Sequence, residues 1–270
     1  MMKKILRSSW LAIVLLFMYL PILILMVYSF TDTATIGTHG NFSLQNYATL
    51  FTTPELLGMI GGTFALAFGS ALIATFLGTM GAIGAFYSKK VPKRLVGLAN
   101  QIPVVNAEVV TAFSLCVLLI VVLGINKDSF VPLVIGHVAL ASPFVYLSVV
   151  PKLKQMDNSI YEAALDLGAN ARQALFKAVI PQLIPGIVSG FLLSVTLSLD
   201  DYFITTYTKP ATFDTISTYV VNATKGSHTE IKTALWALST VLFVLILAVV
   251  ISSNVISGRK AGNRNEKADV

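Results

Sequence analysis

Three acidic side chains stand in segments that are otherwise apolar. Glu108 follows the run IPVVNA, and Asp200 and Asp201 follow the run FLLSVTLSL. A charged side chain near the centre of a membrane span costs about 2.5–3.5 kcal/mol, so one that is kept there usually has a function. The same segments contain no Lys or Arg, whereas paths for anions are usually lined by basic groups. The acids therefore indicate a path for a cation. Tyr202 could add a cation–π contact, or it could anchor the chain at the membrane interface.

The two adjacent aspartates have a second interpretation, in which the helix ends at Leu199 and both carboxylates lie in water. A carboxylate at the C-terminal end of a helix opposes the helix dipole, which argues against that interpretation. Neighbours on a helix point about 100° apart, so only one of Asp200 and Asp201 is expected to face the path, and either could be that one. Glu108 could equally be a packing or gating contact near the cytosolic end of its span.

Six apolar segments are long enough to carry such residues across a membrane. The chain is 55% hydrophobic and 12% charged, whereas a soluble domain has about 25% charged residues. A span needs about 20 apolar residues. The segments that qualify are, approximately, residues 10–30, 58–87, 102–124, 130–150, 183–204 and 234–256. We therefore predict an all-α integral membrane protein, with six transmembrane helices in a single domain of residues 1–270.

The basic residues indicate how these spans are oriented. Most of the 19 Lys and Arg residues lie before the first span, in the second and fourth loops, or after the last span. Cytosolic loops carry such an excess, so both termini and the loop 151–182 are expected in the cytosol. Topology then accounts for the net charge of +6, and no nucleic-acid partner is needed. The polar tail 258–270 is expected to be disordered.

Glycines in the second apolar segment suggest close packing of helices. Gly78, Gly81 and Gly84 are spaced three apart, which keeps them near one helix face. Small residues allow helices to approach closely in lipid. The contact could lie within this chain or at a seam with another subunit.

The loop 151–182 contains the signals of two short helices. Ser159 and Glu162 form an S-x-x-E capping box, with Ser159 as the N-cap of a helix over about 160–167. Gly168 can adopt the left-handed conformation that ends a helix. We expect the first helix to present a shallow apolar face to a partner, made of Ala163, Ala164 and Leu167.

A second helix, over about 171–179, is predicted to follow. Asn170 is its expected N-cap, with Gln173 at the third helical position. Pro181 is expected to end it. Arg172 and Lys177 on this helix could meet acidic groups of a partner. An amphipathic helix resting on lipid headgroups is the alternative, but such a helix usually has large apolar anchors rather than alanines.

The same stretch, EAALDLGANARQALFKAVIP, resembles the conserved loop of bacterial ABC importer permeases of the EAA-motif (MetI-like) family. The matching positions are Glu162, Ala163, Ala164, Gly168 and Pro181. One position departs, because Ala178 stands where the family usually has Ile. The resemblance implies that the loop is a coupling helix seated in a groove on a separate ATPase, which binds ATP and Mg. The chain has no G-x-x-x-x-G-K-[ST] phosphate loop, so we expect a translocation subunit without its own nucleotide site, cofactor or enzymatic activity.

Two further runs indicate a subfamily. SLDDYFIT (198–205) and FSLQNYATLF (42–51) are similar to the C-type permease subunit of spermidine/putrescine importers. The resemblance implies a polyamine path at Glu108, Asp200, Asp201 and Tyr202, in the bacterial cytoplasmic membrane. It also implies a homologous second permease, two ATPase subunits and an extracytosolic substrate-binding protein. Uptake would proceed by alternating access, driven through the loop 159–181.

Other functions remain alternatives at this stage. An importer permease for another substrate, such as ferric iron, would share every feature except the two short runs. A proton-coupled carrier would need sites at broken helices between internal repeats, and the sequence shows no matching halves. A membrane-embedded enzyme would need a reactive cluster within the spans, which is not evident. His39, His137 and His228 have no ligand spacing, so neither a metal site nor a proton relay is predicted.

Overall fold

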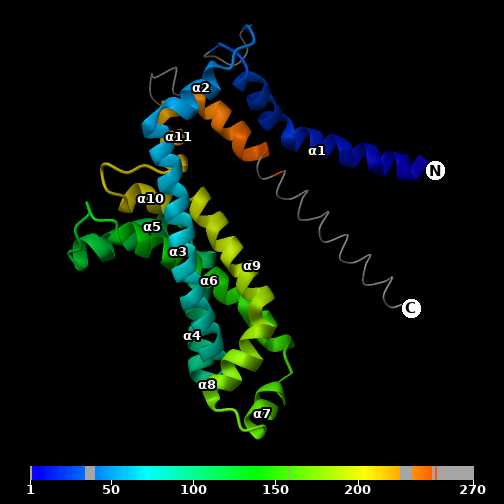
Figure 1. Cartoon of the computed structure of the whole chain (residues 1–270), viewed down its shortest axis with the longest axis vertical. Coiled ribbons are helices and arrows are strands. Elements are labelled where there is room, and N and C mark those ends of the chain that lie inside the picture. The colour runs from blue at the N-terminus through cyan, green and yellow to red at the C-terminus, as the bar shows by residue number, and fades with distance from the viewer. Residues whose placement is uncertain (1, 34–39, 158, 226–232, 245–246, 248–270) are drawn as a thin grey trace. The chain divides into compact units, whose positions relative to one another are not determined.

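The computed structural model describes residues 2–33, 40–157, 159–225, 233–244 and 247. The chain divides into two compact units, one of Met1–Leu57 with Val220–Val270 and one of Gly58–Tyr219. Over the described residues, the secondary structure is helical except for an isolated antiparallel bridge between Thr31 and Phe42 (Figure 1). The predicted all-α class is confirmed for these residues. The predicted tail 258–270 lies outside them.

The first unit contains α1 (Met2–Ser29), α2 (Gln45–Thr52) and an apolar helix over Thr233–Val244. The end of α1 is tied to α2, because the Asn46 amide donates hydrogen bonds to the carbonyls of Ser29 at 3.0 Å and Thr31 at 2.9 Å. The Tyr47 ring packs 5.0 Å from that of Phe30. Between the first two predicted spans, α2 is therefore fixed to the chain that leaves α1.

The second unit is built on three long apolar helices: α3 (Pro54–Tyr87), most of which lies in this unit, α6 (Val131–Gln155) and α9 (Ile180–Asp200). Each lies in a helix long and apolar enough to cross a membrane. The α6 and α9 helices lie side by side (Figure 1). A side-chain carbon on Gly190 would lie 3.1 Å from the Val145 Cα, and one on Gly78 would lie 2.7 Å from the Ser142 carbonyl oxygen. Close backbone contact with α6 therefore sets the core of this unit.

The predicted third span, 102–124, is not one continuous helix. Helix α4 (Lys90–Val105) ends at an extended Asn106, and α5 (Glu108–Cys116) begins two residues later. A π-helical turn, η1 (Val117–Val122), continues α5. The segment made of α5 and η1 is bent by 109° relative to α4. Pro103 in the last turn of α4 removes a backbone donor where the helix fails. The pair is a broken span or a re-entrant segment.

The predicted fifth span, 183–204, also has different ends. The helix begins at Ala171 with α8 (Ala171–Ala174), passes through a π-helical turn, η2 (Leu175–Val179), and continues as α9. Pro181 therefore does not end a helix. It lies in the first turn of α9, after the wider π-helical turn, and a helix tolerates the missing proline N–H there.

At its other end α9 stops at Asp200. The short helix α10 (Phe203–Thr208) follows after two residues, and α11 (Ile216–Lys225) follows α10. The predicted fourth span corresponds to α6 and the second to α3, while the sixth is described only over residues 234–244 and at 247.

Candidate functional site

The helix–glycine–helix element between α6 and α9 forms as the sequence predicts. Helix α7 (Ser159–Asp166) is followed by Gly168, whose φ of +85° is the left-handed conformation that favours glycine. The Asn170 side chain accepts a hydrogen bond from the Gln173 N–H at 2.9 Å, and the Gln173 side chain accepts from the Asn170 N–H at 3.0 Å. This reciprocal capping box confirms the predicted start of the second helix.

The predicted capping box at Ser159 is wrong. Ser159 is already a helical residue, and its N–H donates to the Asp157 carboxylate at 2.9 Å rather than to Glu162. The N–H and side chain of Ser159 lower the pKa of Asp157, because both hydrogen bonds favour the charged carboxylate. An acidic group near the start of α7 also interacts favourably with the positive end of the helix dipole. Asp157 therefore takes the capping role that Ser159 was expected to have.

The two sides of α7 differ in their surroundings. The predicted docking residues are exposed or half-buried, and Leu167 is the extreme case at 89% exposure. The opposite side is attached to the body of the unit, where the Tyr161 ring lies 5.5 Å from that of Tyr87 at the end of α3. Tyr161 also packs against the core cluster around Val149 and Leu183. Exposed or half-buried positions, in this single chain, are Glu162, Ala163, Ala164, Leu167, Gly168, Arg172 and Pro181.

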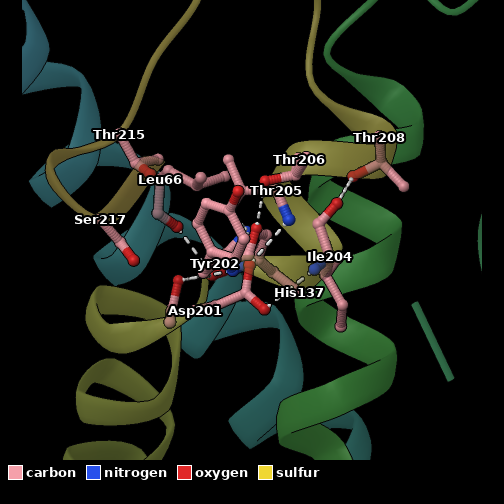
Figure 2. A network of polar contacts seen from close by, with 12 residues as sticks. Leu66, His137, Asp201, Tyr202, Ile204, Thr205, Thr206, Thr208, Thr215 and Ser217 are labelled. Carbon is pink, nitrogen blue, oxygen red and sulfur yellow. Dashed lines mark hydrogen bonds and ion pairs between the residues drawn. The ribbon is translucent and has the colours of Figure 1, made fainter. Parts of the chain in front are cut away.

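The break between α9 and α10 separates the two adjacent aspartates. Asp200 is the last residue of α9 and is exposed, whereas Asp201 is 2% exposed. The Asp201 carboxylate turns back onto α10 and accepts three hydrogen bonds: from the Ile204 N–H at 3.1 Å, the Thr205 N–H at 2.8 Å and the Thr205 hydroxyl at 2.7 Å (Figure 2). Asp201 is therefore the cap of α10. The prediction that both aspartates lie within the fifth span is wrong, and so is the alternative that both are in water.

His137, on α6, lies beside this cap and is fully buried. Its Nε2 is 3.1 Å from the Thr205 hydroxyl oxygen and 3.6 Å from the Asp201 carboxylate (Figure 2). Its Nδ1 is 2.8 Å from the hydroxyl of Ser198, which lies in the last turn of α9. Ser198 in turn lies 3.3 Å from the hydroxyl of Ser70 on α3. Side chains from four helices thus meet in a single buried polar network.

The remaining acid of the predicted path is close to this network. Glu108 begins α5 and is exposed, and its carboxyl lies close enough to those of Asp201 and Asp200 to interact with both electrostatically. Helices α5 and α10 pack together, and the Cys116 thiol donates to the Tyr207 carbonyl at 3.3 Å. The structure therefore brings together three acids that lie far apart in the sequence. Tyr202 is half-buried, with its ring 5.3 Å from that of Phe203.

The sequence did not reveal His137, Ser198 or Thr205 as members of this site. Each is a polar residue in an apolar run, where serine and threonine can also bond to their own helix backbone and histidine can simply be buried. One signal was present: an aspartate followed by Thr-containing sequence can accept backbone N–H groups at the start of a new helix, and Asp201 stands just before Tyr202, the N-cap residue of α10. Within the described ranges, no group of three or more His, Cys, Asp or Glu side chains could hold a metal ion.

Apolar helices surround buried polar groups, and a helix–glycine–helix element lies between two of the long helices, an arrangement that fits a membrane transport subunit. Residues 1–262 match the model of a family described as "Binding-protein-dependent transport system inner membrane component". The chain therefore belongs to this family, and the predicted membership of the importer permeases is confirmed. The family is one of membrane components of transport systems rather than of enzymes.

Similar proteins of known name cover almost the whole chain. A spermidine/putrescine transport system permease protein, PotC, of Haemophilus influenzae is 31% identical over 258 residues, which are 95% of this chain and 98% of that protein. The putrescine transport system permease protein PotI of Escherichia coli K12 is 30% identical over 244 residues, which are 84% of this chain and 85% of that protein. Among solved structures, a bacterial alginate ABC transporter, in complex with a periplasmic protein carrying an alginate pentasaccharide, matches with a TM-score of 0.70 and 17% identity. The match covers 91% of this chain and 92% of that one, and it shows a shared fold.

Proposed function

We propose that this chain is a permease subunit of an ATP-driven, binding-protein-dependent importer that moves polyamines across the bacterial cytoplasmic membrane. One observation carries the substrate: Glu108, Asp200 and Asp201 gather at helix breaks. Over the described residues, neither Lys nor Arg forms an ion pair with any of them. Carboxylates this close repel one another unless a cation or a proton lies between them. A polyamine carries several ammonium groups and would relieve that repulsion. The names of the similar permeases support the same substrate class.

The three acids differ in exposure, which suggests different roles in binding the substrate. Asp201 already accepts three hydrogen bonds and is buried. Asp200 and Glu108 are exposed, so their carboxylates are accessible to a substrate. We assign Asp200 and Glu108 to direct contact with the ammonium groups and Asp201 to the electrostatic field behind them. Tyr202, beside Asp200, is placed to add a cation–π contact.

The energy for transport would enter through α7, Gly168 and α8. In this proposal two ATPase subunits bind ATP and Mg, and the exposed face of α7 seats in a groove on one of them. One continuous helix runs from Ala171 to Asp200, so a displacement of α8 can be delivered directly to the acidic site. The Tyr161–Tyr87 contact offers a second route, from α7 into α3. Together they connect ATP-driven closure to alternating access.

The remaining partners follow from the same proposal. A homologous second permease would complete the path, and an extracytosolic binding protein would deliver the polyamine. The outer surface of the long helices suits a second permease and lipid, because it is rich in exposed apolar side chains such as Leu72, Phe76, Val188 and Leu192. We retain six spans and cytosolic termini as part of this proposal.

The test is uptake of radiolabelled spermidine into proteoliposomes that contain this chain, its co-purifying permease and ATPase, and the binding protein. We expect uptake that requires ATP, resists a protonophore, and is competed by putrescine but not by an amino acid or ferric iron. If the assembled complex hydrolysed ATP and moved ferric iron instead, the proposed importer class would stand and the proposed polyamine substrate would be wrong. Uptake that a protonophore abolishes would indicate a proton-coupled carrier, the one rival that would use a His137–Asp201 pair.

A further inference from the structure

His137 is a fully buried titratable side chain that the proposed transport path does not itself use. Its ring lies between two elements that the chain separates by a break: Nδ1 contacts Ser198 in the last turn of α9, and Nε2 faces Thr205 in α10. The backbone of α6 next to His137 also lies close to α10. A side-chain carbon on the neighbouring Gly136 would lie 2.6 Å from the Ile204 side chain. This part of α6 is therefore packed directly against the first turn of α10.

The hydrogen bonds determine which nitrogen of His137 carries its proton. The Thr205 hydroxyl has one hydrogen, which it donates to the Asp201 carboxylate at 2.7 Å. Toward His137, the Thr205 oxygen can therefore only accept, and the carboxylate oxygen 3.6 Å away also accepts. Nε2 faces two acceptors and must be the protonated nitrogen. In the neutral ring Nδ1 is then the acceptor, and the Ser198 hydroxyl donates to it at 2.8 Å.

We propose that His137 is a positioning residue, which in its Nε2–H form holds the Asp201 cap against α6 and sets the break at which Asp200 is exposed. The three hydrogen bonds to Asp201 come from α10 itself, so they fix the carboxylate to α10 but not to the rest of the unit. The imidazole supplies that attachment and joins it to α9 through Ser198. The imidazole thereby contributes, with the packing of Ile204 against Gly136, to the angle between α9 and α10 and to the direction of Asp200. This inference rests on the proposed function, since Asp200 is the residue that it aims at the polyamine.

The test compares two amides that each preserve one half of the ring. In His137→Gln the amide nitrogen can reach the place of Nε2 and donate toward Thr205 and Asp201. In His137→Asn the shorter amide reaches only the place of Nδ1 and meets Ser198. We expect His137→Gln to keep the KM for spermidine close to that of the wild type. His137→Asn should raise it about tenfold, the equivalent of one hydrogen bond of about 1.4 kcal/mol, at similar ATPase activity and amounts of assembled complex. Equal KM values for the two amides would overturn the proposal.

A spectroscopic measurement tests the same assignment without changing residue 137. In a His39→Gln, His228→Gln chain, His137 is the only histidine, and solid-state ¹⁵N NMR of the intact complex in liposomes can identify which ring nitrogen is protonated. We expect Nε2–H with an unprotonated Nδ1. An Nδ1–H ring would overturn the proposal. If the wild-type complex moved no polyamine, the proposed function would fail, but the ¹⁵N result would still decide the role of His137 in holding Asp201.

Discussion

Asp201→Asn is the substitution that most sharply separates a structural carboxylate from one that contacts substrate. The two oxygens of Asp201 accept from three donors, all buried: Ile204 N–H on one oxygen, and the N–H and hydroxyl of Thr205 on the other. Asparagine keeps one acceptor oxygen and turns the other into an NH₂ donor. Whichever way the amide is placed, at least one buried N–H then faces a donor and loses its partner.

The magnitude follows from the better of the two placements. With the amide oxygen toward Thr205, only the Ile204 N–H is left without an acceptor, which costs about 1–3 kcal/mol. The bonds that remain lose their charge assistance, and such bonds are roughly twice as strong as neutral ones. We expect a total loss of about 2–4 kcal/mol in the free energy of unfolding. By the scaling for large soluble domains, about 2–4 °C for each kcal/mol, that corresponds to a fall in the unfolding midpoint of about 4–16 °C.

Asp200→Asn is the matched control, because it removes the same charge one residue earlier at an exposed position. Surface substitutions usually change stability by about 0.5 kcal/mol or less, so its midpoint should stay close to that of the wild type while spermidine uptake falls. Heating each variant complex and following the intact fraction by size-exclusion chromatography measures the midpoint. The reasoning would be refuted if Asp201→Asn kept the wild-type midpoint and raised only the KM, because Asp201 would then be a ligand rather than a cap.

Three further predictions test other parts of the structure. Gly78→Ala should lower the unfolding midpoint, because its new carbon would meet the Ser142 carbonyl oxygen at 2.7 Å, whereas Gly84→Ala, with open space around it, should leave it equal or slightly higher through a helix-propensity gain of about 1 kcal/mol. Gly168→Pro should leave membrane insertion intact but uncouple ATP hydrolysis from uptake, since proline cannot adopt a φ of +85°; normal uptake would contradict the docking role of the loop. Hydrogen exchange of α7 should be faster in Asp157→Asn than in the wild type at neutral pH. The pKa of Asp157 is lowered in the folded chain, so the contribution of this carboxylate to the stability of α7 is fully present above its ordinary pKa. That contribution is lost as the pH falls through the lowered pKa, and there the exchange rates of the two proteins should converge. A difference that persists at that pH would show another cause.

The sequence predicted most reliably where local chemistry decides the structure. The glycine turn at Gly168 and the capping box of Asn170 with Gln173 need only neighbouring residues, and both are confirmed. Which glycine allows close helix packing could be learned only from tertiary contacts: Gly78 packs tightly against α6, while Gly84 faces open space. Equal spacing along the helix could not separate them, because it says nothing about the partner helix. The same limit explains why His137 was overlooked, since its partners Ser198 and Thr205 lie more than sixty residues away.

The prediction at the aspartates failed through a correct principle applied to the wrong helix. A carboxylate is unfavourable at the C-terminal end of a helix and favourable at the N-terminal end. If residues 183–204 formed one helix, the first half of that rule would carry the helix past Asp201. The chain follows the second half, because it starts α10 there and places Asp201 at its N-terminal end.

Glu108 obeys the same rule at the other break. It begins α5 two residues after the extended Asn106, so a carboxyl at the start of α5 and one just before α10 lie close together. Irregular backbone at membrane depth is tolerated where it is buried in protein or lines a cavity, and many transporters place substrate sites at such broken helices. In this chain the breaks explain why acidic residues are stable there. Asp201 accepts hydrogen bonds from the start of α10, and Glu108 lies at the start of α5, where the helix dipole favours a carboxylate without a basic partner. In the proposed function, the negative field of these acids is then available to a cationic substrate.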